Sequence, residues 1–464
     1  MSGEDTIAAI ATPPGRGGIG MVRLSGGRSL EIASAFIRLA QFPPEVQRAT
    51  LGEFFDPASA GTMDQVVATH FRAPHSYTGE DVLEICCHGA PVVLEYLLEC
   101  CLARGARLAE PGEFTMRAFL NGRIDLAQAE AIRDLIDSRT LYQARVAAQQ
   151  MEGAVAARLK KPKEALVELI AILEAGIDFA EDDVPVSGWE NISLRAGAIR
   201  RELATMAESG RLGKVIREGL SLAIAGCPNA GKSSIFNRLI DQDRAIVTEI
   251  PGTTRDLVSE TANLSGIPLR LIDTAGIRET VDRVERIGVE KSCQAIADAD
   301  LRLLVIDISE GLTAEDEKLY KKLRPLGPMV IACNKSDLPP KVTPDDLARW
   351  FTPPSTEDSI PVVWVSALTG DAIPALHQAV LSLVAPGHAI RPEGELMTNL
   401  RHQQCVQSAL GSTDKALQAA AQRIPHEMLL LDLYDALHAL DAVTGATTTD
   451  DLLTVIFSTF CVGK

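Results

Sequence analysis

Residues 226–233 read Gly-Cys-Pro-Asn-Ala-Gly-Lys-Ser and match the phosphate-loop pattern G-x-x-x-x-G-K-[ST] completely. Such a loop holds phosphate between a strand and the N-terminus of a helix, because backbone N–H groups of the turn contact the phosphate oxygens. The neighbouring residues fit, since Ser221–Ala225 is an apolar, strand-like run and Ser234–Leu239 can begin a helix. The sequence therefore predicts a nucleotide triphosphate site in a domain of strands and helices.

The positions of this loop have separate predicted roles. Gly226 and Gly231 let backbone N–H groups approach phosphate. Lys232 reaches the outer phosphates, and the hydroxyl of Ser233 binds Mg²⁺. The predicted nucleotide-binding set also includes two small residues in and beside the loop, Ala230 and Ser234.

Two later segments are predicted to complete the phosphate side of the site. Asp273-Thr274-Ala275-Gly276 follows an apolar run, which brings a carboxylate near the water shell of the metal and the Gly276 N–H near the γ-phosphate. Pro251-Gly252-Thr253-Thr254 lies between the phosphate loop and that segment. A loop in this position supplies a threonine to Mg²⁺ when the γ-phosphate is present, and Thr254 is the candidate.

Two further segments indicate that the base is guanine. Asn334-Lys335-Ser336-Asp337 follows another apolar run. Asp337 can accept hydrogen bonds from the ring N–H and the exocyclic amine of guanine, a donor pair that adenine lacks. Ser366-Ala367-Leu368 is expected to contact the guanine carbonyl through backbone N–H groups. The predicted ligand is GTP with Mg²⁺.

The chain of 464 residues is too long for one ordinary core, so several domains are expected. Residues 220–384 predict a Ras-like, doubly wound G domain, because strand-like runs alternate with helices. Those runs are Ser221–Ala225, Leu269–Ile272, Leu303–Asp307, Met329–Cys333 and Val362–Val365. The predicted G domain interrupts an all-α helical domain, whose halves are residues 124–219 and 385–464. Helical periodicity predicts helices over 126–173, 400–423 and 427–442. Pro162 is expected to mark a break or a helix start.

Residues 1–123 predict a separate α/β domain, with strands near 6–11, 20–24 and 82–86 and a helix near 92–102. Gly15-x-Gly17-x-x-Gly20 matches a dinucleotide-binding pattern, but a strand-like run follows it where that pattern needs a helix, so we reject it. Cys86, Cys87 and His88 are rejected as a metal site, because no second ligand pair occurs at zinc spacing.

Composition narrows the possible partners and locations. The formal net charge of −17 makes nonspecific attraction to nucleic acid weak, so RNA must be met locally or through a partner. The nine cysteines lack a zinc or disulfide framework and fit reduced thiols in the cytoplasm. Met1–Asp5 does not resemble the start of a signal peptide, and no apolar run is long enough to span a membrane. A cytoplasmic protein without a membrane partner is expected.

The motifs do not identify the residue that orients the attacking water. Small signalling GTPases place a glutamine directly after Asp-x-x-Gly, but this chain has Ile277, which cannot hydrogen-bond water. Arg278, Glu279 and Glu285 lie on the same segment and are the polar candidates. The motifs alone do not choose among them.

At this point the chain resembles the MnmE (TrmE) family of tRNA-modification GTPases over nearly its whole length. The resemblance rests on five motifs in addition to the phosphate loop, at residues 12–20, 76–81, 111–122, 251–256 and 460–464. It implies a homodimer with an N-terminal folate-binding and dimerising domain, a helical domain and an inserted G domain. It also implies a hetero-oligomer with an FAD-containing partner that modifies C5 of the wobble uridine in tRNA, using a 5-formyltetrahydrofolate-type one-carbon donor.

The resemblance further implies roles for individual residues. The potassium ligands of the family match Asn229, Thr248, Ile250 and Thr253, and its water-orienting glutamate matches Glu285. Its folate-binding positions match Arg23, Glu84, Arg123 and Lys464. This chain departs from the family at Arg123, where lysine is frequent, and at Val462, where isoleucine is usual. Cys461 is either a reactive, folate-proximal thiol or an ordinary cysteine.

Two other functions compete with this interpretation of the sequence. A GTP-timed RNA-binding or ribosome-assembly factor would use its G domain only as a timer. Such a factor is expected to carry a basic RNA-binding appendage, and the sequence offers none. A stand-alone folate enzyme with an added G domain is disfavoured, since no acid–base or nucleophile constellation is visible outside the G domain.

Overall fold

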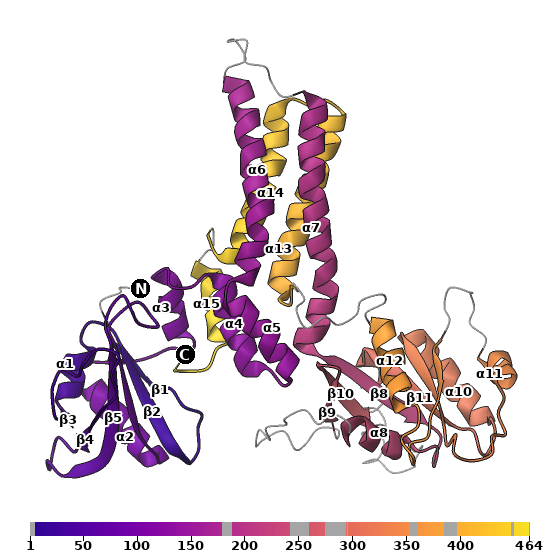
Figure 1. Ribbon diagram of the computed structural model, residues 1–464, viewed down its shortest axis with the longest axis horizontal. Coiled ribbons are helices and arrows are strands. Elements are labelled where there is room, and N and C mark those ends of the chain that lie inside the picture. The colour runs from indigo at the N-terminus through magenta and orange to yellow at the C-terminus, as the bar shows by residue number, and fades with distance from the viewer. Residues whose placement is uncertain are drawn as a thin grey trace. The chain divides into compact units, whose positions relative to one another are not determined.

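The computed structural model describes residues 5–178, 188–241, 259–273, 294, 296–351, 360–384, 397–446 and 450–463. The described chain divides into two compact units, and Figure 1 labels the elements of both. The first unit contains residues 1–133, 150–161 and 437–464, and the second contains residues 134–149 and 162–436. Each unit is described by itself.

The N-terminal part of the first unit is a seven-stranded sheet with the order β3-β4-β5-β6-β2-β1-β7. All neighbours pair antiparallel except β1 and β7, which are parallel. The strands are β1 (Ile7–Ile10), β2 (Gly17–Ser25), β3 (Ile37–Leu39), β4 (Thr50–Phe55), β5 (Thr62–Phe71), β6 (Val82–Gly89) and β7 (Arg107–Leu108), and the helices of this part are α1 (Ser29–Ser34), α2 (Pro91–Ala103) and α3 (Glu113–Leu120).

Helix α2 packs on one face of this sheet, where Leu94 and Leu97 join Leu24 and Ile85 in a buried cluster. Gly20 permits the close approach, because a Cβ at this position would lie 2.5 Å from a methyl carbon of Leu94. The strands and the helix predicted for residues 6–102 are confirmed. The glycine-rich stretch before residue 20 leads into strand β2. The rejected dinucleotide pattern would have required a helix at this place.

The second unit contains a six-stranded sheet with the order β13-β12-β11-β8-β10-β9. Among the strands that the structure describes in this sheet, β9 and β10 pair antiparallel and the other neighbours pair parallel. The five predicted parallel strands are confirmed. The elements are β8 (Leu220–Gly226), α8 (Lys232–Asp241), β9 (Ser259–Leu264), β10 (Ile267–Asp273), β11 (Leu301–Asp307), α10 (Ala314–Leu323), η1 (Arg324–Leu326), β12 (Met329–Asn334), α11 (Pro344–Trp350), β13 (Val362–Trp364) and α12 (Ile373–Val384).

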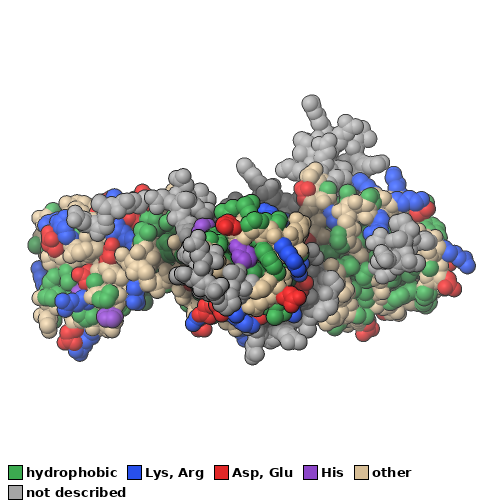
Figure 2. All heavy atoms as spheres, turned by 90° about the horizontal axis from the view of Figure 1, so that it is seen from above, with side chains coloured by type: hydrophobic (Ala, Val, Ile, Leu, Met, Phe, Trp, Pro, Cys, Tyr) green, Lys and Arg blue, Asp and Glu red, His purple; other side chains and the backbone are tan. Residues whose placement is uncertain are grey.

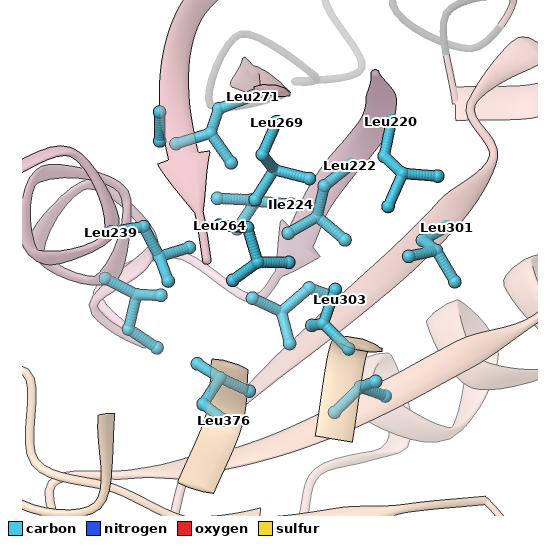
Figure 3. Close-up of a cluster of buried hydrophobic side chains, with 14 of the residues drawn as sticks. Leu220, Leu222, Ile224, Leu239, Leu264, Leu269, Leu271, Leu301, Leu303 and Leu376 are labelled. Atoms are coloured by element: carbon cyan, nitrogen blue, oxygen red, sulfur yellow. The ribbon is translucent and has the colours of Figure 1, made fainter. Parts of the chain in front are cut away.

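Alternation along β8 divides the core of this sheet into two layers. Leu222 and Ile224 face a cluster that includes residues of α8 and α12, whereas Ala223 and Ala225 face a cluster with residues of α10 and α11. Figure 3 shows the first cluster, in which Leu376 of α12 lies near leucines of several strands. Helices therefore cover both faces, as a doubly wound sheet requires.

The remaining helices of the described chain vary in length, from 9 residues in α15 to 30 residues in α7. They are α4 (Leu126–Asp137), α5 (Leu141–Met151), α6 (Ala154–Asp178), α7 (Trp189–Glu218), α13 (Leu400–Ala421), α14 (His426–Thr444) and α15 (Asp450–Ser458). Helices α6, α7, α13 and α14 run side by side (Figure 1). The Tyr434 hydroxyl donates to Glu174 of α6 at 2.5 Å, and the rings of Trp189 and His426 lie 4.6 Å apart.

Two residues with low helix propensity, a proline and a glycine, lie inside long helices. Pro162 neither breaks nor begins a helix, because it lies inside α6, where Leu159 and Leu166 are fully buried and hold the helix by packing. Gly213 lies inside α7 at the point where this helix contacts the backbone of Met397. A Cβ at position 213 would lie 1.9 Å from the Met397 carbonyl oxygen. Within the described residues, no helix is both long and apolar enough to cross a membrane.

Candidate functional site

The phosphate loop joins the carboxyl end of β8 to the N-terminus of α8, so the predicted strand–loop–helix context is present. Gly226 must lack a side chain, because a Cβ would lie 2.4 Å from the Val305 carbonyl oxygen. Gly231 has a φ of +93°, and a Cβ there would lie 2.1 Å from Asn334 Nδ2. The two glycines thus allow the loop to lie directly against β11 and β12.

The lysine of the loop lies across the turn. Lys232 Nζ donates to the carbonyl oxygens of Gly226 and Cys227, each at 2.9 Å. A phosphate oxygen could replace either acceptor, because an ammonium group binds anions more strongly than neutral carbonyls. Ser233 and Ser234 follow in the first turn of α8 and are exposed.

Asn334 connects the loops of the site. Its Nδ2 donates to the Ala230 carbonyl oxygen at 2.8 Å, and its Oδ1 accepts from the Ala367 N–H at 3.0 Å. The side chain is buried at the carboxyl end of β12. Asn334 therefore braces the phosphate loop against the loop after β13, and both of its polar atoms are used in doing so.

The loop after β13 positions Asp337, the residue predicted to bind the guanine base. Ser366 Oγ donates to Asp337 Oδ1 at 2.5 Å and accepts from the Thr369 N–H at 3.1 Å. The backbone N–H groups of Ser366 and Ala367 are both engaged, by the Asp371 carbonyl and by Asn334. Ser366 and Ala367 are predicted to offer N–H groups to guanine; in the structure the Ser366 N–H bonds within its own loop and the Ala367 N–H bonds to Asn334 at the end of β12.

Arg238 was not identified from the sequence. It lies on α8 and donates from Nε to the Ala367 carbonyl oxygen at 2.8 Å and from Nη2 to that of Leu368 at 2.6 Å. The helix that begins at the phosphate loop thereby also anchors the loop expected to meet the base. No short-range pattern indicates this role, because the partners are about 130 residues apart in the sequence.

Cys227 is a residue to which the sequence assigns no role, and its surroundings disfavour the thiolate form. Its Sγ lies 3.9 Å from Thr313 Oγ1 and 3.8 Å from Glu315 Oε2, near the N-terminus of α10. Burial, together with the nearby carboxylate of Asp316, raises the pKa of this thiol to about 12. The side chain is a neutral thiol at physiological pH.

Asp273 is the last residue of β10 and lies in register with Ile224 of β8, so its backbone ends at the edge of the sheet that carries the phosphate loop. Lys335 has a φ of +67° and its ammonium pairs with Asp307 at the end of β11. Several predicted residues lie outside the described part of the chain, namely Thr248, Ile250, Thr253, Thr254, Gly276, Glu285 and Lys464.

A second group of predicted residues meets in the first unit. Arg23 on β2 forms an ion pair with Glu84 on β6 at 2.7 Å, and its Nη1 donates to the Gly463 carbonyl oxygen at 3.3 Å. The guanidinium also lies 5.7 Å from the ring centres of both Tyr77 and Phe114. The structure therefore brings Arg23, Glu84 and the end of the C-terminal tail together.

Arg123 follows α3 and lies close to the loop between β5 and β6. Its side chain lies against Gly79, where a Cβ would be 3.3 Å from Arg123 Cγ. Nearby, Arg117 forms ion pairs with Glu80, Asp5 and Glu113, at 3.1, 2.6 and 3.0 Å respectively. These contacts join the 76–81 and 111–122 motifs, and no local sequence pattern indicates that the two segments are braced in this way.

Comparisons with known proteins match the whole chain. A family model described as the MnmE helical domain matches residues 126–461, and one described as the GTP-binding protein TrmE N-terminus matches residues 6–123. A protein of Koribacter versatilis (strain Ellin345), described as tRNA modification GTPase MnmE, is 52% identical over 467 residues, which cover 100% of each chain. A protein of Geotalea uraniireducens (strain Rf4) with the same description is 43% identical over 463 residues, 99% of each chain.

The solved structures that match include that of Aquifex aeolicus Era bound to GDP.AlF4−. It is 26% identical, covers 42% of this chain and 66% of its own, and has a TM-score of 0.29.

Proposed function

The chain belongs to the MnmE family of tRNA modification GTPases, and from this premise we propose that it couples K⁺-dependent GTP hydrolysis to modification of C5 of the wobble uridine in tRNA. The observation that carries the proposal is the side chain of Asn334, which joins Ala230 of the phosphate loop to Ala367 of the loop after β13. One rigid bridge thus links the segments expected to hold the phosphates and the base of a single nucleotide.

The residues of this chain would divide the binding of GTP among them. Lys232 would exchange a carbonyl acceptor for a phosphate oxygen, and the Asp337 carboxylate would accept from the base. Because the N–H groups of Ser366 and Ala367 are engaged elsewhere, we assign the contact with the guanine carbonyl to the Leu368 N–H. Leu368 is exposed, and Arg238 holds its carbonyl oxygen at 2.6 Å.

We propose that two cations bind beside the phosphates. Mg²⁺ would be held by Ser233 and Thr254, and K⁺ by Asn229, Thr248, Ile250 and Thr253. Of these residues, the structure describes Asn229 in the phosphate loop and Ser233 in the first turn of α8. When bound, the cations would supply neutralisation of phosphate charge, which an arginine does in other GTPases. Glu285 would orient the attacking water.

The Arg23–Glu84 pair and the tail support a folate site in the N-terminal domain. A carboxylate such as Glu84 can accept paired hydrogen bonds from the aminopyrimidine edge of a pterin, and cations suit the glutamate part of the ligand. Arg23 is partly exposed beside the half-buried ring of Tyr77, so a charged and an aromatic group lie together there. Arg123 and Lys464 would add positive charge, and the ligand would be a 5-formyltetrahydrofolate-type donor.

We propose that tRNA is held by an assembly rather than by this chain alone. The formal net charge is −17, and Figure 2 shows acidic and basic side chains interspersed on the face that it presents. Weak attraction to RNA is expected from such a surface. A homodimer associated with an FAD-containing partner would supply the remaining contacts and the redox chemistry.

The experiment that tests this function is nucleoside analysis of tRNA from cells whose chromosomal gene carries Asp337→Asn. We expect loss of C5-modified wobble uridines, because the variant can no longer read guanine. A matched strain with Glu317→Gln, on the exposed surface of α10, should keep normal tRNA. Full modification in the Asp337→Asn strain, with the variant present at normal abundance, would contradict the proposal.

A further inference from the structure

The second residue of the Asn334–Asp337 segment is held in an unfavourable backbone conformation. Lys335 has a φ of +67°, in the left-handed region, where a residue with a Cβ is less stable by about 1–2 kcal/mol. Its long side chain is also ordered, although free lysine side chains have large rotamer entropy. A specific interaction must offset these costs.

The side chain of Asp307 provides that interaction. Asp307 ends β11, the strand next to β12, and lies in register with Asn334. Its Oδ2 forms the ion pair with Lys335 Nζ. Its Oδ1 accepts from the backbone N–H of Ser309 at 2.9 Å and from Ser309 Oγ at 2.6 Å, so the carboxylate is fixed by its own loop.

The backbone around the pair is fixed as well. The Ile308 N–H donates to the Asn334 carbonyl oxygen at 3.2 Å, and the Lys341 N–H donates to the Ile308 carbonyl oxygen at 2.7 Å. The side chains of Asp307 and Lys335 are 11% and 30% exposed, so solvent screens their attraction only in part. Burial alone would raise the pKa of Asp307, but the ion pair with Lys335 and the hydrogen bonds from Ser309 hold it below its ordinary value, and the group is ionised at neutral pH.

We propose that Asp307 is a positioning residue of the guanine site, which fixes Lys335 before nucleotide binds so that its hydrocarbon stem can cover the face of the base. The inference rests on the proposed function of the Asn334–Asp337 segment. A side chain ordered in advance loses less entropy on binding, so affinity increases without a new contact. GDP and GTP share the base and should benefit equally, whereas the chemical step should not depend on Asp307.

The test compares Asp307→Asn with the unaltered full-length protein in titrations with a fluorescent GDP analogue and with a nonhydrolysable GTP analogue. Both dissociation constants should rise by about five- to tenfold, the range expected when a partly buried charged partner is lost. The turnover number at saturating GTP should change less than about twofold. Asp307→Glu should restore part of the affinity, and Glu317→Gln should change nothing, because its Lys321 partner lies on the surface of α10.

A double-variant cycle shows whether Asp307 acts through Lys335. If it does, Asp307→Asn combined with Lys335→Gln should bind GDP no more weakly than Lys335→Gln alone. Unchanged affinity in Asp307→Asn, or additive losses in the double variant, would overturn the inference. So would an equal loss of affinity and of thermal stability that Asp307→Glu fails to rescue, because that pattern indicates a merely structural role.

Asp337→Asn separates this inference from the guanine site itself. That variant should prefer xanthosine diphosphate over GDP. If it does and Asp307→Asn still binds GDP normally, only the role of Asp307 fails. If neither Asp337→Asn nor Lys335→Gln weakens GDP binding, the guanine site fails and the role of Asp307 fails with it.

Discussion

Asn229 of the phosphate loop has both a left-handed backbone conformation and a side chain with a predicted role in binding potassium. Its φ of +61° lies in the left-handed region, which glycine and asparagine tolerate better than other residues. The resemblance to the family also makes its side chain a candidate potassium ligand. A change to alanine would therefore disturb the backbone and remove the ligand together, whereas Asn229→Gly removes only the ligand.

The potassium role leads to a prediction about rate. GTP hydrolysis by the unaltered protein should be at least about tenfold faster in K⁺ than in Na⁺, a difference of roughly 1.4 kcal/mol in barrier height. In Asn229→Gly this ratio should approach one, while GDP affinity changes by less than about threefold. Initial rates at matched ionic strength measure the effect. A variant that keeps the full preference for K⁺ would show that the Asn229 side chain is not a ligand.

At the residue scale, the sequence predicted positions that belong to continuous motifs. The need for glycine at 226 and 231 follows from the phosphate-loop pattern, although their contacts with Val305 and Asn334 do not. The roles of Arg238 and Asp307 were not predicted, because each residue contacts a loop that is distant in the sequence. Arg238 on α8 contacts the loop after β13, and Asp307 at the end of β11 contacts the loop after β12. Strand order, which no local pattern encodes, determines which strand ends become neighbours.

Among the elements, α5 is joined to the G-domain sheet by a few polar contacts. Thr140 Oγ1 donates to the Gly266 carbonyl oxygen at 2.6 Å, in the turn between β9 and β10. Gln143 Nε2 donates to the carbonyl oxygens of Ile216 and Arg217 at 2.8 and 2.9 Å, in the last turn of α7. The Gln143 side chain thus satisfies helix-end carbonyls that have no partner within their own helix.

Gln143→Ala should destabilise the second unit by about 2–3 kcal/mol, because buried carbonyl groups lose their donors. Its Oε1 also accepts from the Arg139 N–H at 2.8 Å, so the start of α5 should weaken as well. Urea unfolding followed by circular dichroism measures the change. Gln149→Ala, at an exposed position of the same helix, is the control and should change stability by less than about 0.5 kcal/mol. Equal stability of the two variants would mean that Gln143 is dispensable.

Element boundaries were only partly predictable. Helical periodicity over 126–173 indicated long helices, but not the interruptions at 138–140 and 152–153. Strand β9 was missed, because among its residues 261–264 only Ala262 and Leu264 are buried and no continuous apolar run marks the strand. An edge strand that pairs on one side needs less apolar sequence than the central strands, which are buried on both faces.

On the scale of the whole molecule, the C-terminal tail closes onto the N-terminal sheet. Arg23 and Gly463 are in contact although they are 440 positions apart. Gly463 has a φ of +95°, and a Cβ there would lie 2.5 Å from the Ile10 carbonyl oxygen. Composition and periodicity gave no sign of this contact, and only the resemblance to the family linked the tail with Arg23.

The tail provides a test of the folate site that spares the core. Phe460 is buried and packs on Phe457, so a deletion that includes it would remove core packing. Deletion of residues 462–464 removes the carbonyl that accepts from Arg23 and the predicted cation Lys464, but it keeps Phe460. Affinity for 5-formyltetrahydrofolate should fall by about tenfold or more, the scale expected for lost charge-assisted contacts.

Calorimetric titration of the deletion variant measures that loss, and Val462→Ala is the matched control, because the Val462 side chain is half exposed and the tail keeps its length. GTP hydrolysis should be unchanged in both variants, because the sheet that carries the phosphate loop belongs to the other unit. Retained folate affinity in the deletion variant would place the ligand away from Arg23 and the tail. An equal loss in Val462→Ala would instead mean that packing of the tail, rather than its charge, determines binding.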